Sequence, residues 1–264
     1  MGSILIPAMV AQGYDAGFSS ALSAISGSLG TVIPPSITFI IYGMITGESI
    51  GDLFLSGIVP GLIFGFMLCI MVFIKSKKNG WKGETQRASL KEIGRLFLDT
   101  IWGLLSPVIV LGGIYSGLFT PTEAAAVAVV YSLIVGIFIY KELRLAELKE
   151  TLFSTAKTTG MILLIIMNAG IFSWVLTQQG IAASLTEMAL ALTDNKYIML
   201  VIINIVFLCA GCVMDNTSAL YILVPIIMPI AKALDINMIQ LGVILVLNLS
   251  IGQVTPPVGP NLYV

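Results

Sequence analysis

Long charge-free stretches alternate with short charged segments along this chain. Several of these stretches reach the roughly 20 apolar residues that a helix needs to cross a bilayer. Their apolar residues do not alternate with a period of two, which excludes a membrane β-barrel. The pattern predicts an all-α membrane protein with apolar runs at Ala16–Gly47, Leu53–Ile74, Thr100–Thr122, Ala124–Tyr140, Thr158–Thr186, Tyr197–Met214, Asn216–Ala231 and Ile236–Val264.

The composition excludes several classes of function. Of the 264 residues, 57% are hydrophobic and 10% are charged, against about 25% charged in an ordinary soluble domain. This excludes soluble enzyme folds. The net charge of −1 gives no attraction to nucleic acid, and the absence of histidine excludes His-based catalysis. Asp215 is the one acid that lies deep in an apolar region, so an intramembrane protease with two aspartates is not predicted, and we expect a protein that is not an enzyme.

The basic residues predict how the chain is oriented. Eleven of the 13 Lys and Arg residues fall in two clusters, at 75–95 and 141–157. We interpret both clusters as loops, which the positive-inside rule places in the cytoplasm. The chain between them crosses twice, so the turn near Phe119 faces outward. There Thr120, Pro121 and Glu123 have the spacing of a helix start with a capping box.

A short internal repeat is the most informative feature of the sequence. Ser28–Pro35 reads SLGTVIPP, and Ser250–Pro257, 222 residues later, reads SIGQVTPP. The predicted orientation makes the two copies run in opposite directions through the membrane. Pro-Pro breaks a helix because proline lacks an N–H and clashes with the preceding turn. Paired broken helices in two inverted halves indicate a transporter site near the bilayer midplane.

A polar segment, Asp215–Ser218, separates two short apolar runs before the second copy of the repeat. We interpret Tyr197–Met214 and Asn216–Ala231 as the arms of a re-entrant hairpin with this segment at its tip. A carboxylate at membrane depth is costly and usually functional, and its oxygens suit a hard cation. The alternative is that these side chains simply cap the two half-helices. Both interpretations stay open at this point.

The repeat also predicts what lies beyond the two ends. At the same offset Gly2 aligns with Val224, after the tip segment, and Val264 aligns with Tyr42, inside a span. We therefore expect Gly2–Gln12 to be the second arm of a first hairpin whose tip is missing, and the full-length protein to extend at both ends. The predicted division is 1–52 and 158–264 for the two transport-domain parts, with 53–157 as scaffold-type helices and basic loops.

At these residues the sequence resembles the large membrane (permease) subunit of tripartite ATP-independent periplasmic (TRAP) transporters. The resemblance covers nearly the whole chain. The stretches that carry it are GSILIPAM from Gly2, Gly30–Gly43, GGIYSGLFTPTEAAAVA from Gly112, and Asp215–Gly259.

The resemblance implies a function and its partners. The family imports organic acids such as C4-dicarboxylates or sialic acid across the cytoplasmic (inner) membrane of bacteria and archaea, driven by sodium. A periplasmic binding protein delivers the substrate, and a small four-helix membrane subunit joins the large one. The family is thought to work by an elevator motion, in which a transport domain slides against a scaffold. Sodium is the coupling ion, and no other cofactor or metal is expected.

The resemblance also implies site residues at matching positions. One sodium site would use Ser26, Gly27, Ser28, Gly30 and Thr31, with a hairpin partner missing from this chain. The second would use Asp215, Asn216, Thr217, Ser218, Asn248, Gly252, Gln253, Val254 and Thr255. Half-helix N-termini after the two Pro-Pro pairs carry partial positive charge that suits a carboxylate, so the expected substrate contacts are Pro35, Ser36, Thr38, Ser218, Pro257 and Asn261.

Two other functions remain open from the sequence alone. A sodium symporter of the related divalent-anion superfamily would need no binding protein. A scaffold subunit that does not transport is the other alternative. The sequence does not identify the acid.

Overall fold

The computed structural model describes residues 2–81 and 89–263, and all regular elements in these ranges are helices. They comprise eleven α-helices of 10 to 34 residues, a π turn and a 3₁₀ turn. Within the described ranges, five helical segments are long and apolar enough to cross a membrane: Ile50–Asn79, Leu90–Tyr115, Pro121–Ile139, Glu147–Gln178 and Asn216–Ala233. The prediction of an all-α protein rich in membrane-capable helices is confirmed.

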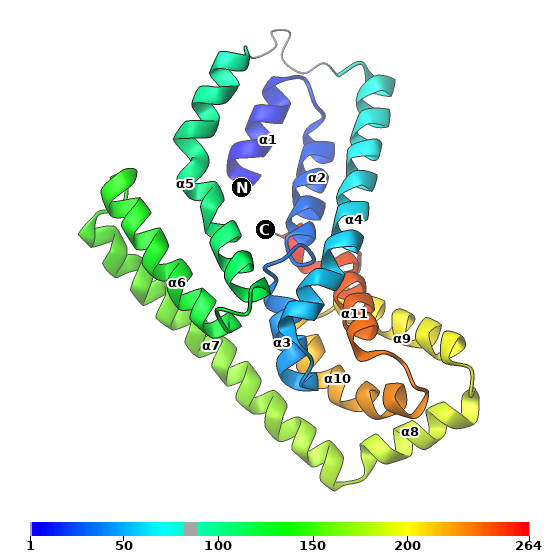
Figure 1. Ribbon diagram of the computed structural model, residues 1–264. Helices are drawn as coiled ribbons and strands as arrows, with labels where there is room; N and C mark the ends of the chain where they lie inside the picture. The colour runs from blue at the N-terminus through cyan, green and yellow to red at the C-terminus, as the bar shows by residue number, and fades with distance from the viewer. Residues whose placement is uncertain (1, 82–88, 264) are drawn as a thin grey trace. The chain divides into compact units, whose positions relative to one another are not determined.

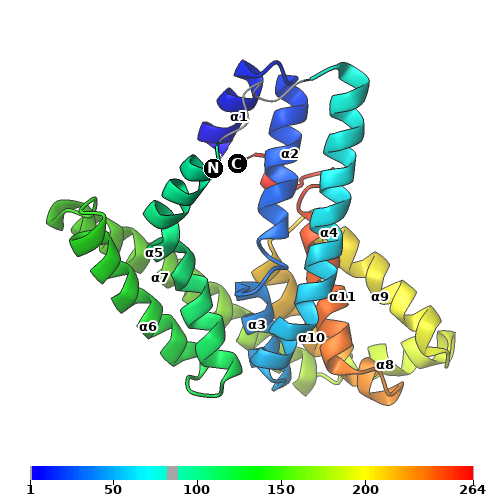
Figure 2. The same ribbon diagram turned by 45° about the horizontal axis from the view of Figure 1, so that its top comes forward.

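The chain forms two compact units, one made of residues 1–83 and 165–264 and the other of residues 84–164. The first contains α1 (Gly2–Ala11), α2 (Ala16–Leu29), α3 (Ile37–Thr46), α4 (Ile50–Asn79), the end of α7 (Leu145–Gln178), α8 (Ile181–Leu192), α9 (Lys196–Gly211), α10 (Asn216–Ala233), α11 (Met238–Gly252) and η2 (Pro260–Leu262). Within it, α2 and α4 lie side by side in Figure 1 and in the turned view of Figure 2. The predicted division at residues 52 and 157 stays a prediction.

The core of the first unit lies where α3, α4 and α11 meet. Phe39 and Tyr42 of α3 are fully buried, as is Leu53 of α4. A Cβ at Gly242 of α11 would lie 2.5 Å from the Tyr42 ring, so only glycine lets the two helices come this close. The Tyr42 hydroxyl donates to the Met238 carbonyl at 2.6 Å. Each large buried side chain contributes about 1.5–3 kcal/mol relative to exposure in water, so this cluster fixes α3 against α11.

The second unit contains α5 (Leu90–Tyr115), α6 (Pro121–Ile134), the π turn η1 (Val135–Ile139) and the start of α7. The Tyr131 hydroxyl of α6 donates to the Trp102 carbonyl of α5 at 2.6 Å. The predicted capping box is confirmed. The Glu123 N–H donates to the Thr120 hydroxyl at 3.3 Å, and the Thr120 N–H donates to the Glu123 carboxylate at 2.8 Å.

The run Thr158–Thr186 is not the single helix that the sequence predicted. The chain turns at Gly180, whose φ of +67° ends α7 before α8 begins. Glycine adopts this left-handed conformation without the steric cost that a Cβ would bring. The span therefore ends several residues earlier than the charge-free run does.

The two basic clusters are only partly loops, which corrects a second prediction. Lys149 and Lys157 lie within α7. Leu, Ala, Glu and Lys all have high helix propensity, so a charged segment of this composition extends the helix. The first cluster likewise begins inside α4 and ends inside α5, while Lys82 and Arg87 lie outside the described residues.

Candidate functional site

The first Pro-Pro pair breaks a helix as predicted. Between α2 and α3 the Gly30 N–H donates to the Gly27 carbonyl at 3.1 Å, not to the Ser26 carbonyl one residue earlier. The Thr31 N–H likewise donates to the Ser28 carbonyl at 3.1 Å. Such 3₁₀ hydrogen bonds are common at helix ends. Because the Gly30 N–H bonds the Gly27 carbonyl, the Ser26 carbonyl loses the donor that a continuous α-helix would supply. Beyond the break, the Ser36 hydroxyl accepts from the Phe39 N–H and begins α3.

The second copy of the repeat ends α11 in a similar way. The Val254 N–H donates to the Ile251 carbonyl at 3.2 Å, and the Thr255 N–H donates to the Gly252 carbonyl at 2.9 Å. Both Pro-Pro bonds are cis. In the described part of the chain, the segment after Pro257 forms the three-residue 3₁₀ turn η2. A helix N-terminus after Pro257 that could meet a carboxylate stays a prediction.

Side chains from the two breaks are hydrogen-bonded to each other. The hydroxyls of Thr31 and Ser250 lie 2.6 Å apart. The Asn261 amide nitrogen lies 2.8 Å from the Ser28 hydroxyl and 3.1 Å from the Gln253 side-chain oxygen. Ser28 and Ser250 are fully buried, and Gln253 is 8% exposed. Thr31 and Asn261 are half-buried, so residues more than 200 positions apart in sequence form one partly buried polar cluster.

The predicted tip lies at the junction of α9 and α10. The Asp215 carboxylate accepts from the Ser218 N–H at 3.1 Å and from the Ser218 hydroxyl at 2.6 Å, so it caps α10. The next side chain, Asn216, is 6% exposed, and its buried Oδ1 has no hydrogen-bond partner among the described residues. A buried acceptor left unpaired costs about 1–3 kcal/mol. The capping interpretation is therefore correct for Asp215, while Asn216 has an oxygen available for another ligand.

The tip is tied to the second break through the backbone. The N–H groups of Val258 and Gly259 both donate to the Cys212 carbonyl, at 3.2 and 3.0 Å. Just before the tip, α9 and α11 come into direct backbone contact at Gly211 and Gly252. A Cβ at Gly252 would lie 2.6 Å from the Gly211 Cα. The tip and the segment after the second Pro-Pro pair are therefore held together.

A polar pair links α9 and α11 one turn further from the break. The Asn248 amide nitrogen donates to the Asn204 Oδ1 at 2.6 Å and to the Ile244 carbonyl at 2.8 Å. Asn248 was predicted as a site residue, but Asn204 was not. An amide inside the apolar helix Lys196–Gly211 is the sequence signal that could have identified it, since polar side chains in membrane helices usually find a partner on a neighbouring helix.

The other predicted residues differ in burial. Thr38 is buried at 6% exposure in α3, beside the fully buried Phe39. The exposed positions are Gly27, Gly30, Pro35 and Pro257, and the half-buried ones are Thr217, Ser218, Val254 and Thr255. The Thr255 hydroxyl donates to the Ile251 carbonyl in the last turn of α11, the helix that precedes it, at 2.8 Å.

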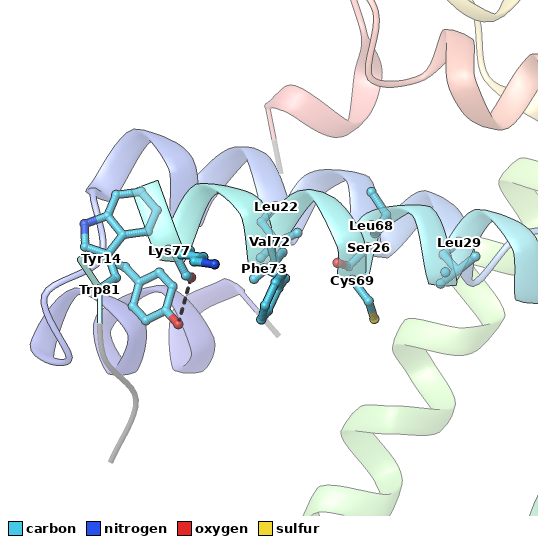
Figure 3. A pocket seen from close by; sticks show the side chains of 12 residues that line it. Tyr14, Leu22, Ser26, Leu29, Leu68, Cys69, Val72, Phe73, Lys77 and Trp81 are labelled. Atoms are coloured by element: carbon cyan, nitrogen blue, oxygen red, sulfur yellow. Dashed lines mark hydrogen bonds between the residues drawn. The ribbon is translucent and has the colours of Figure 1, made fainter. Parts of the chain in front are cut away.

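Ser26 lines an apolar groove of about 810 Å³ between α2 and α4 (Figure 3). Tyr14 and Trp81 close one end, with ring centroids 5.1 Å apart, and Leu29 lies at the other end. Most of the remaining lining is aliphatic or aromatic, with Ser76 and Lys77 near the Trp81 end. This chemistry does not suit a carboxylate, so we do not assign the transported acid to the groove.

Comparisons with known proteins identify the family of the chain. The family model described as tripartite ATP-independent periplasmic transporter, DctM component, matches residues 1–264. The chain is 44% identical to the C4-dicarboxylate TRAP transporter large permease protein DctM of Pseudomonas aeruginosa, over the whole chain and 62% of that protein. It is 37% identical to the sialic acid TRAP transporter large permease protein SiaM of Vibrio cholerae, over the same shares.

A third relative is a longer protein. The isethionate TRAP transporter permease protein DctMQ of Oleidesulfovibrio alaskensis is 42% identical over the whole chain, which spans 42% of that protein. The chain thus spans about two fifths to three fifths of the length of these relatives. With a family match over every residue, the chain belongs to the DctM component family, the large permease proteins of tripartite ATP-independent periplasmic transporters.

Proposed function

We propose that the full-length protein is the permease subunit of a sodium-coupled transporter that imports an organic acid delivered by a periplasmic binding protein. The observation that carries the proposal is the partly buried polar cluster joining the two helix breaks, with Thr31 bonded to Ser250 and Asn261 bonded to Ser28. Broken helices that meet in a polar centre are typical of ion and substrate sites in secondary transporters. The named relatives are transporters of C4-dicarboxylates, sialic acid and isethionate, which supports an organic acid as substrate.

Two sodium sites follow from this proposal. The first uses Ser26–Thr31, where the Gly30 N–H donates to the Gly27 carbonyl and not to the Ser26 carbonyl, together with a hairpin tip outside this chain. The second uses Asp215–Ser218 with Asn248 and Gly252–Thr255. The Oδ1 of Asn216, buried and unpaired within the described part of the chain, supports the second site, because hard cations prefer oxygen ligands.

The substrate is proposed to bind at the start of α3. Ser36 caps this ten-residue helix, and Pro35 is exposed just before it. The N-terminus of a helix carries partial positive charge, which suits a carboxylate. Thr38, Ser218 and Pro257 remain proposed contacts.

We further propose the assembly and motion that the family resemblance implies. A small four-helix membrane subunit would join the large one in the cytoplasmic membrane. The parts 1–52 and 158–264 would form a transport domain of inverted repeats with re-entrant hairpins. This domain would move as an elevator against scaffold helices in 53–157. The long apolar helices support a place in the membrane. The basic C-terminal end of α4 and the basic N-terminal part of α7 support the predicted orientation, in which these ends face the cytoplasm.

The proposal is tested by uptake into proteoliposomes. The full-length protein is reconstituted with its small subunit, with and without its binding protein, against a panel of labelled organic acids. The proposal predicts uptake of one acid that requires both the binding protein and an inward sodium gradient. Sodium-driven uptake that ignores the binding protein would indicate a divalent-anion symporter instead, and no uptake of any acid would favour the scaffold alternative.

A further inference from the structure

The two cross-break contacts are equivalent in sequence but differ in structure. Thr31 and Ser250 touch directly, with their hydroxyls 2.6 Å apart. The repeat offset of 222 residues maps Thr31 onto Gln253 and Ser250 onto Ser28. The equivalent pair is therefore Gln253 with Ser28, and this contact is made through Asn261, whose amide nitrogen bonds both side chains.

The bonding of Asn261 argues against a direct role in binding the substrate. An amide nitrogen carries two hydrogens, and these donate to Ser28 and Gln253. The remaining oxygen is an acceptor and offers no donor to a carboxylate. The Asn261 backbone N–H also donates to the Gln253 carbonyl at 3.0 Å, which holds the side chain over the second break.

Asn261 also stands between the tip and the first break. The Cys212 carbonyl, next to the tip, accepts from Val258 and Gly259. Two residues after Gly259, the Asn261 side chain donates a hydrogen bond to Ser28, which belongs to the first proposed sodium site. The Asn261 side chain connects the second break to the first at Ser28, beside the direct contact between Thr31 and Ser250.

We propose that Asn261 is a positioning residue that couples the two sodium sites, so that an ion at one break orders the other. This rests on the proposed function, since it requires sodium to bind at both breaks. Packed hydrogen-bond networks can carry such coupling between two sites. Such coupling is measured as a change in the sodium affinity of one site when sodium occupies the other site.

The test is sodium binding to the purified full-length protein, measured by calorimetry with sodium chloride replacing choline chloride. Asn261→Leu keeps the size of the side chain and removes both donors. The proposal predicts cooperative binding in the unmodified protein. In Asn261→Leu we expect the Hill coefficient to fall toward about 1 and the half-saturating sodium concentration to rise about threefold or more.

The control is Asn237→Ala, which removes an N-cap at the opposite end of α11 and weakens the same helix without touching the breaks. An equal change in both variants would show a general structural effect and overturn the proposal. An unchanged Hill coefficient in Asn261→Leu, with a raised KM for the acid at saturating sodium, would make Asn261 a substrate contact. No sodium binding by the unmodified protein would overturn the proposed function as well.

Discussion

Gly211 and Gly252 hold α9 and α11 in backbone contact immediately beside the proposed ion site. A Cβ added at Gly252 would lie 2.6 Å from the Gly211 Cα, and one added at Gly211 would lie 2.9 Å from the Leu249 carbonyl oxygen. Neither neighbour is a flexible side chain that could move aside. The contact thus positions the tip against the second break.

Gly252→Ala should therefore separate the two helices and lower the free energy of unfolding by about 1–3 kcal/mol, the usual cost of overpacking. Thermal unfolding in detergent measures this loss. Gly170→Ala in α7 is the control, because a Cβ added there would meet nothing within 4 Å among the described residues beyond its own helical turns. We expect the control to be neutral or slightly stabilising. Equal midpoints for Gly252→Ala and the unmodified protein would contradict the close contact.

Thr31→Val should weaken the link between the two breaks. The substitution keeps the shape of the side chain but removes the hydroxyl that lies 2.6 Å from Ser250. A hydrogen bond of this kind contributes about 0.5–1.5 kcal/mol. A double-mutant cycle with Ser250→Ala should give a coupling energy of about 1 kcal/mol, measured from unfolding free energies. Strictly additive effects would show that the two hydroxyls do not stabilise one another.

Asp215→Asn separates the two roles of the tip carboxylate. Asparagine caps a helix about as well as aspartate, so α10 should stay folded with an unchanged unfolding midpoint. If the carboxylate also binds sodium, the half-saturating sodium concentration for uptake should rise by about tenfold, equivalent to about 1.4 kcal/mol. Uptake with unchanged sodium dependence would leave Asp215 as a helix cap alone.

Glu123→Ala should destabilise the second unit, whereas Glu123→Gln should not. The capping box needs an acceptor at this position for the Thr120 N–H, now at 2.8 Å, and Gln supplies one as Glu does. The alanine variant is expected to unfold at a lower temperature than the unmodified protein, as read from the unfolding midpoint. A loss of uptake in the Gln variant with normal stability would instead assign the charge of Glu123 a role in transport.

Sequence reasoning succeeded where local chemistry decides the structure. The Pro-Pro pair at Pro34–Pro35 predicted the first break, and the spacing of Thr120 and Glu123 predicted the capping box. The prediction of one helix through Gly180 was wrong. A charge-free run indicates a segment that can lie in lipid, but it does not indicate whether the helix is continuous. Helix continuity there depends on a single left-handed glycine.

The contacts of the site were harder to predict. The backbone approach of Gly211 to Gly252, the Asn204 partner of Asn248 and the Cys212 carbonyl all join residues about 40 or more positions apart. Periodicity and motif spacing describe single elements, so they do not reveal which elements touch. The sequence also did not predict that the Asn261 amide bonds Ser28 and Gln253.

Acid and sodium are proposed to move together through this permease, and their fluxes measured side by side test this coupling most directly. Full-length protein, small subunit and binding protein are reconstituted in proteoliposomes, and labelled acid and labelled sodium are followed in the same sample. We predict that both enter together at a fixed ratio and that the acid accumulates only with an inward sodium gradient. Accumulation of the acid without sodium entry, driven equally well by a proton gradient, would contradict the coupling.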